Sequence, residues 1–178
     1  VLRRAGEEYP AWVTERYLQY PPSVPFRVKT LAERITQPFN NVFDKASAME
    51  AYLREITYNE FISAPPPERD VVDYFLFTSR QGYCNYYASA MTVMLRMLGV
   101  PARIASGYAR GEYDSETDAY ILRESDLHTW VEVFFPTYGW IEFEPTASEP
   151  TIDRIEPPPT DSSESDADAE AAIARARR

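Results

Sequence analysis

Cysteine and histidine are almost absent from this sequence, which has one of each, Cys84 and His128, among its 178 residues. A single cysteine excludes a disulfide within the chain, and a zinc site built from cysteine and histidine needs more such ligands than the chain has. We therefore expect no metal and no cofactor. The cysteine is either an inert buried thiol or a reactive one.

Long apolar runs and a surplus of positive charge are also lacking. No stretch approaches the ~18 consecutive apolar residues of a membrane span, and no signal peptide opens the chain. The 18 Lys and Arg residues face 28 Asp and Glu, for a formal net charge of −10. Because an acidic protein repels phosphates, we expect no nucleic acid partner. Any membrane association is expected only through segments absent from this chain.

Composition divides the chain into three parts. Residues 1–40, which contain aromatics and proline, are interpreted as an N-terminal extension that packs on the core. Residues 41–148 carry the periodic apolar patterns of a folded domain. Residues 149–178 are acidic, rich in proline and serine and poor in aromatics, which predicts a disordered linker.

The order of the predicted elements indicates an α+β fold. Apolar residues at helical spacing predict a helix over 28–35, a second with Asp44 as its N-cap, and a third from Cys84 to Leu98. Later segments alternate between apolar and polar residues and are interpreted as strands. They are 103–108 and 120–123 around an acidic turn, then 128–135 and 140–144. Helices followed by an antiparallel meander are typical of the α+β class.

Cys84 lies where a loop becomes the third helix. Free backbone N–H groups and the positive end of the helix dipole favour the thiolate, which is the nucleophilic form. Most free cysteines are instead small buried hydrophobes. His128 shares a strand face with Trp130, and imidazole can hold the proton of a thiol near neutral pH. A lone histidine is more often structural, but here it follows the cysteine in helix-then-strand order.

A catalytic imidazole needs an acceptor that fixes its tautomer. Glu144, at the end of the strand next to that of His128, is the first choice. Glu142 is the runner-up, and Asp126 and Glu132 are weaker choices. For any of them, a solvated carboxylate is the alternative interpretation.

Further candidates follow from the needs of acyl transfer. The backbone N–H of Cys84 is the natural first donor to an oxyanion. The candidates for a second donor are Gln81, Tyr83 and Tyr108. The candidates for lining a substrate cleft are Trp130 and Trp140. The alternating acids of the turn, Asp114, Glu116 and Asp118, lack the glycine and distal glutamate of a calcium loop and are interpreted as a solvated hairpin tip.

Three segments resemble motifs of the transglutaminase-like superfamily. Residues 82–88 (GYCNYYA) resemble its cysteine motif, residues 128–133 (HTWVEV) its histidine motif and residues 139–146 (GWIEFEPT) its acid motif. The order and intervals fit over about 41–148, and agreement of several motifs in order is more specific than any one of them. The family usually has aspartate where this chain has Glu144.

This resemblance implies a papain-like α+β fold, with the nucleophile helix packed on an antiparallel sheet. It also implies cysteine-dependent acyl transfer on carboxamides of a protein or peptide substrate through Cys84, His128 and Glu144. An amine acceptor would give cross-linking, and water would give deamidation or proteolysis. The chain resembles the bacterial membrane-anchored, TgpA-type group, which implies an extracytoplasmic location in a membrane protein. The alternative is a non-catalytic peptide- or cell-wall-binding domain with the same fold.

Overall fold

The computed structural model describes residues 1–109 and 111–154, so most of the predicted linker lies outside the described residues. The helical elements are η1 (Leu2–Arg4), α1 (Ala11–Tyr17), α2 (Phe26–Thr36), α3 (Val42–Arg54), α4 (Val71–Tyr74), the π-helical η2 (Phe75–Ser79), α5 (Cys84–Met97) and η3 (Glu124–Asp126). The strands are β1 (Thr57–Tyr58), β2 (Gln81–Gly82), β3 (Ala102–Tyr108), β4 (Glu112–Asp114), β5 (Ala119–Ile121), β6 (Leu127–Phe135) and β7 (Gly139–Phe143). No helix in these residues is long and apolar enough to cross a membrane.

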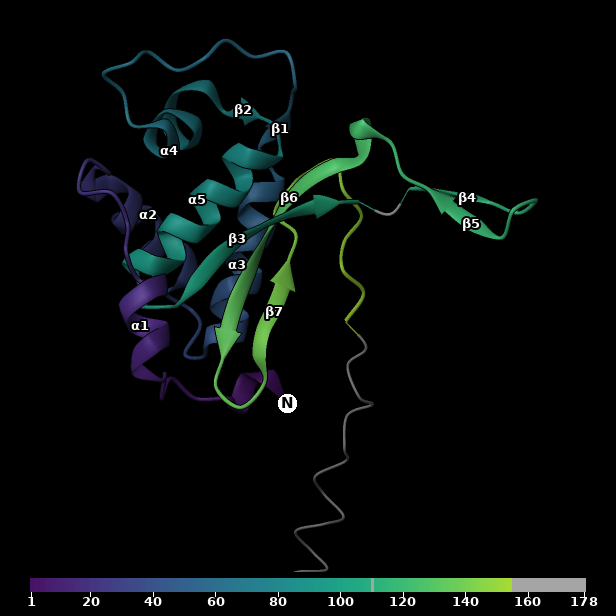
Figure 1. The fold of residues 1–178 in the computed structure, drawn as a ribbon. Helices are drawn as coiled ribbons and strands as arrows, with labels where there is room; N and C mark the ends of the chain where they lie inside the picture. Colours follow the sequence, from purple (N-terminus) through teal and green to yellow (C-terminus); the bar gives the residue numbers. More distant parts are fainter. Residues whose placement is uncertain (110, 155–178) are drawn as a thin grey trace, which may run out of the picture.

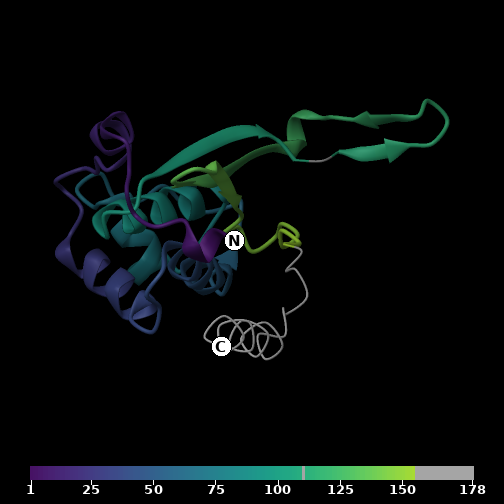
Figure 2. The same ribbon diagram turned by 90° about the horizontal axis from the view of Figure 1, so that it is seen from below.

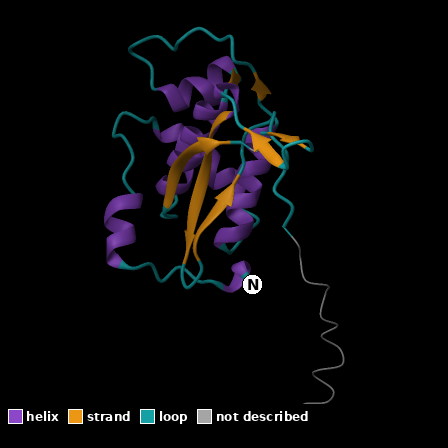
Figure 3. Cartoon of the chain, turned by 45° about the vertical axis from the view of Figure 1, so that its right-hand side comes forward, coloured by secondary structure: helices purple, strands orange, loops and turns teal. Residues whose placement is uncertain are grey.

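The main sheet has three antiparallel strands in the order β3-β6-β7, and α5 packs against β3 and β6 (Figures 1 and 3). The α+β prediction, with the helix that begins at Cys84 packed on an antiparallel sheet, is confirmed. Along β6, Val131, Val133 and Phe135 are fully buried. Because strand side chains alternate, His128 and Trp130 lie on the opposite face of the sheet.

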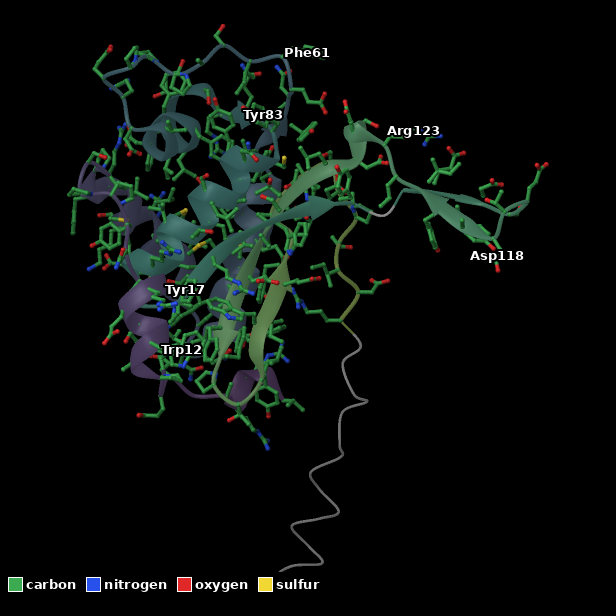
Figure 4. All side chains as sticks on the ribbon, viewed as in Figure 1. Trp12, Tyr17, Phe61, Tyr83, Asp118 and Arg123 are labelled. Carbon is green, nitrogen blue, oxygen red and sulfur yellow. The ribbon has the colours of Figure 1, made fainter. Side chains whose placement is uncertain are left out.

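The α5 helix is the centre of the core. Its fully buried residues are Tyr87, Ala88, Ala90, Met91, Met94 and Leu95. This wide apolar surface lets α2, α3 and α4 pack around α5. The N-terminal α1 lies beside the sheet, where Trp12 contacts Phe134 at 5.8 Å between ring centroids (Figure 4). The division of the chain at residues 40 and 148 remains a prediction.

The predicted N-cap of α3 is wrong by three residues. Asn41, not Asp44, caps the helix, and its side-chain oxygen accepts a hydrogen bond from the Asp44 backbone N–H at 2.9 Å. The Asp44 carboxylate in turn accepts from the Asn41 side-chain amide at 2.8 Å. The two residues form a local pair at the helix start, so Asp44 takes the third helical position, where an acidic group also favours the helix dipole.

The predicted hairpin between 103–108 and 120–123 is also wrong. β3 pairs with β6, with Gly107 opposite His128, while β5 pairs only with β4 among the described residues. Figure 2 shows the β4–β5 ribbon projecting away from the rest of the domain. All three residues of β5 are exposed. The residues of β5 are apolar, but β5 projects from the domain and has no core to cover, so it stays outside the main sheet.

Candidate active site

Cys84 is the first residue of α5, and the backbone before it is held on two sides. Residues 81–82 form β2, which pairs in parallel with β1 so that Tyr58 lies opposite Gly82. A Cβ atom on Gly82 would come within 2.9 Å of the Tyr86 side chain and 3.1 Å of the Phe75 ring. Glycine is therefore required for this close packing, which places the thiol at the helix start.

His128 meets Glu144 where β6 extends beyond β7. The pairing of these strands ends with Val131 opposite Phe143, so the first residues of β6 have no partner on β7. The chain leaving β7 passes this free edge, and Glu144 Oε2 lies 2.6 Å from His128 Nε2. Both residues are only 8% exposed. A carboxylate at this nitrogen fixes the tautomer and leaves Nδ1 available to Cys84.

The thiol of Cys84 and the imidazole of His128 line the same cavity and interact electrostatically. Burial raises the pKa of the Cys84 thiol, but the hydrogen bond and charge of His128, with smaller contributions from Thr129, lower it below the ordinary value. The contact with Cys84, followed by that with Glu144, raises the pKa of His128 to about 10. Both shifts favour a thiolate–imidazolium pair at neutral pH.

Two residues of α3 hold the backbone around Glu144, and sequence reasoning missed both. The Glu50 carboxylate accepts from the Glu144 backbone N–H at 2.6 Å. Arg54 donates to the carbonyl oxygens of Glu144 at 2.9 Å and Thr146 at 2.7 Å. The Thr146 N–H donates to Glu144 Oε1 at 2.9 Å. Helical spacing puts Glu50 and Arg54 on one face of α3, but no local signal marks partners some 90 residues later.

Among the described residues, Glu144 is the one predicted acid that contacts His128. Glu132 is paired with Arg103 at 2.5 Å. Asp126 accepts from the backbone N–H of residue 123 at 2.6 Å. Glu142, the runner-up, lies opposite Glu132 in the sheet and is exposed.

Two cavities meet at His128. A cavity of about 380 Å³ is lined by Tyr58, Glu60, Cys84, Ala109, Ser125, Asp126, Leu127, His128, Ser148 and Glu149. A cavity of about 420 Å³ is lined by Tyr108, Ala109, His128, Trp130, Glu142, Glu144, Glu149, Pro150 and Ile152. The two cavities share Ala109, His128 and Glu149.

The predicted oxyanion donors do not line the Cys84 cavity among the described residues. The Gln81 side-chain oxygen accepts from Asn59 at 3.1 Å. Tyr83 stacks edge-on against Tyr86, with ring centroids 5.0 Å apart (Figure 4). Tyr108 lines the second cavity.

Of the two tryptophans predicted to line a substrate cleft, Trp130 lines one of these two cavities and Trp140 lines neither. Trp130 lines the second cavity beside His128. Trp140 lies under the Arg103 guanidinium, with the cation 4.2 Å from the ring centroid, and contacts Tyr17 at 4.6 Å. It lines neither of the two cavities described above.

Tyr58 is a site residue that the sequence alone did not reveal. It lines the Cys84 cavity, and its hydroxyl donates to Glu60 at 2.8 Å. Burial and then the Glu60 contact raise the pKa of Tyr58 to about 12, so the phenol keeps its proton at neutral pH. Only the parallel β1–β2 pairing brings residue 58 next to Cys84. In residues 1–109 and 111–154, no group of His, Cys, Asp or Glu side chains could hold a metal ion.

The sequence that forms this fold matches a known protein family. Residues 29–145 match the family model of the transglutaminase-like superfamily. The chain belongs to this superfamily. The predicted resemblance of residues 82–146 to motifs of this family is thereby confirmed. Cysteine-dependent acyl transfer is the general activity of transglutaminase-like proteins.

The chain is similar to two bacterial protein sequences and one crystal structure. A protein-glutamine gamma-glutamyltransferase of Pseudomonas aeruginosa is 34% identical over 134 residues, covering 74% of this chain and 20% of that protein. The uncharacterised protein YebA of Bacillus subtilis is 44% identical over 152 residues, covering 82% of this chain and 20% of YebA. The crystal structure of the periplasmic domain of TgpA from Pseudomonas aeruginosa matches with a TM-score of 0.68 and 30% identity, covering 78% of this chain and 48% of that chain. This transglutaminase-like chain thus spans about a fifth of the two sequence relatives and about half of the crystallised domain.

Proposed function

We propose that this chain catalyses cysteine-dependent acyl transfer on carboxamide groups, with Cys84, His128 and Glu144 as its catalytic triad. The observation that carries the proposal is that the thiol and the imidazole line one cavity and that the imidazole lies 2.6 Å from a buried carboxylate. The activity named for the Pseudomonas aeruginosa relative, protein-glutamine gamma-glutamyl transfer, supports a glutamine side chain of a protein as the substrate.

In the first step the Cys84 thiolate attacks the carboxamide carbon and forms a C–S bond. The carbonyl oxygen becomes an oxyanion, for which the Cys84 backbone N–H at the helix start is a free donor. The Tyr58 hydroxyl lines the same cavity and becomes a second donor once its hydrogen bond to Glu60 is released. The C–N bond then breaks, and the His128 imidazolium gives its proton to the leaving ammonia or amine, which leaves a thioester.

In the second step an amine or water attacks the thioester carbon. His128, now neutral, takes a proton from the attacking group while the sulfur departs as the thiolate, which restores the thiolate–imidazolium pair. An amine gives a cross-linked amide, and water gives the carboxylic acid. The second reactant has to enter the Cys84 cavity, because Nδ1 of His128 faces Cys84 and Nε2 is held by Glu144. Glu144 keeps the imidazole in the orientation that both steps need.

We also propose that the domain works outside the cytoplasm, as part of a bacterial membrane protein. The likeness to the periplasmic domain of TgpA supports this location. An alkaline phosphatase fusion to the full-length protein tests it, because the phosphatase is active only after export. An inactive fusion that is present at normal abundance would contradict the location.

A glutamine peptide incubated with a labelled primary amine tests the activity. The wild-type protein should release ammonia and incorporate label, and Cys84→Ala and His128→Ala should do neither. Glu68→Gln is the matched control, because it changes an exposed carboxylate that lines neither cavity at His128. Peptide binding without product from the wild-type protein would favour a non-catalytic binding domain instead.

A further inference from the structure

The β4–β5 ribbon, residues 111–123 and here called the arm, is a two-stranded element without further support from the domain. Its strands pair only with each other among the described residues. Figures 1 and 2 show it extending away from the helices and the main sheet. An isolated two-stranded hairpin is only marginally stable in water. Both outer edges of this ribbon are therefore open to another polypeptide segment.

The arm exposes an unusual amount of apolar surface for its size. Tyr113 and Tyr120 are paired across the strands, with ring centroids 5.2 Å apart, and are 51% and 52% exposed. Leu122 is 55% exposed, and Ile121 is also exposed. Adjacent exposed aromatic and aliphatic side chains mark interaction surfaces. The arm is therefore suited to contact another polypeptide.

The base of the arm is continuous with the candidate active site. Tyr108 and Ala109, just before the arm, line the cavity beside Trp130. Ser125 and Asp126, just after it, line the cavity that contains Cys84. At about 3.3 Å per residue, the distance from Ala109 to the turn of the arm is about 25 Å. A polypeptide that enters either cavity can thus extend along the arm.

The charge of the arm indicates the partner. The acidic residues between 111 and 126 are Glu112, Asp114, Glu116, Asp118, Glu124 and Asp126. The one basic residue there is Arg123, which is paired with Glu112 at 3.3 Å. Figure 4 shows Asp118 towards the outer end of the arm and Arg123 near its base. Hydrogen bonds from Thr117 and the Glu116 backbone lower the pKa of Asp114, so it is ionised.

We infer that the arm binds a basic, extended segment of the protein substrate that flanks the reacting glutamine. The inference rests on the proposed function, because it concerns how that substrate reaches Cys84. Exposed strand edges and aromatic rings supply sequence-tolerant contacts, and the acidic side chains select lysine and arginine by charge. The glutamine itself is held in the cavities.

Three synthetic peptides test the inference. Each has one glutamine and, about seven extended residues away on either side, a block of lysine, serine or glutamate, which matches the length of the arm. For the wild-type protein we expect kcat/KM to fall from the lysine to the serine to the glutamate peptide. The lysine-to-glutamate ratio should be about tenfold at low salt, which corresponds to about 1.4 kcal/mol. It should shrink in high salt.

Two triple variants separate the arm from general charge. Glu116→Gln/Asp118→Asn/Glu124→Gln removes three of the six acidic charges between residues 111 and 126, and asparagine tolerates the positive φ of 53° at residue 118. Glu8→Gln/Glu15→Gln/Glu68→Gln removes the same charge from exposed sites elsewhere in the chain. The ratio should fall below about twofold in the arm variant and stay near the wild-type value in the control. Equal ratios in the two variants would overturn the inference.

A peptide-binding assay tests the role of the arm independently of turnover. Fluorescence anisotropy of the labelled peptides with Cys84→Ala protein should give the same order of affinities, and the arm substitutions should remove it. If the wild-type protein turns over the serine peptide but the lysine peptide binds no better, the proposed function stands and the arm inference fails. If no peptide is turned over but the arm-dependent order of binding persists, the proposed function fails and the arm inference stands.

Discussion

Replacing His128 by alanine is expected to slow the alkylation of Cys84 at neutral pH. In the wild-type site, burial raises the pKa of the thiol and the hydrogen bond and charge of His128 more than offset that effect. Without the imidazole, burial is opposed only by the contacts with Thr129, so the thiol pKa rises. A smaller fraction of the protein then carries the thiolate that reacts.

The size of the effect follows from two opposing trends. Each unit by which the thiol pKa rises lowers the thiolate fraction about tenfold at a pH below that pKa. The intrinsic nucleophilicity increases by only about threefold per unit, because the Brønsted coefficient is about 0.4–0.5. The alkylation rate near neutral pH should therefore fall about threefold for each unit of pKa that His128 accounts for.

The pH profile gives the sign of the coupling. In the wild-type protein the thiolate is lost as pH falls through the lowered pKa of Cys84. The imidazolium is lost as pH rises through the raised pKa of His128, at about 10. Between these limits the ion pair persists, so the alkylation rate should stay nearly flat. In His128→Ala the rate should instead climb steadily through the range of an ordinary or raised thiol pKa.

Iodoacetamide under pseudo-first-order conditions, followed by intact-protein mass spectrometry, measures this rate. Because Cys84 is the only cysteine in the chain, every added carbamidomethyl group reports on it. Glu142→Gln should leave the profile unchanged. A wild-type profile that rises like that of a free peptide thiol, or one that His128→Ala does not alter, would refute the coupling.

Three further outcomes are expected. Glu144→Gln should lower kcat/KM by about 10²–10⁴-fold through loss of the orienting carboxylate, whereas Glu142→Gln should change it little; equal effects in steady-state kinetics would contradict this assignment. Tyr58→Phe should lower kcat by up to about 10²-fold with little change in KM, and unchanged kcat would exclude its hydroxyl as an oxyanion donor. Arg54→Met should lower the free energy of unfolding by about 2–4 kcal/mol in denaturant titrations, because buried carbonyl groups lose their donor; a smaller change would show that these bonds are replaced by water.

Local patterns in the sequence determined three of the helices, α2, α3 and α5, and the position of the nucleophile, but they did not reveal α1 or α4. The apolar stripe of residues 84–98 predicts α5 almost to its ends, and the change from loop to helix places Cys84 at its start. Such patterns can be read from sequence because helical periodicity is set by the geometry of a few neighbouring residues. The same reasoning misplaced the α3 cap, since Asn41 and Asp44 are both good capping residues and only the folded helix shows which one caps.

The pairing of the strands was the main feature that the sequence did not predict correctly. Alternation predicted strands near 103–108 and 120–123 but not their partners, and the structure pairs β3 with β6 instead. An exposed segment and a half-buried strand can both alternate over a few residues. The difference lies in whether an apolar face has a core to cover.

The family motifs and their order could be read from the sequence, but the contacts within the site could not. Glu144 rather than Glu142 meets His128 because β7 stops opposite Val131 and the chain then crosses the free edge of β6. Tyr58 reaches the Cys84 cavity only through the pairing of two short strands that are distant in the sequence. Periodicity and composition act over one or two turns of chain, whereas the meeting of particular side chains depends on strand register and on where each element ends.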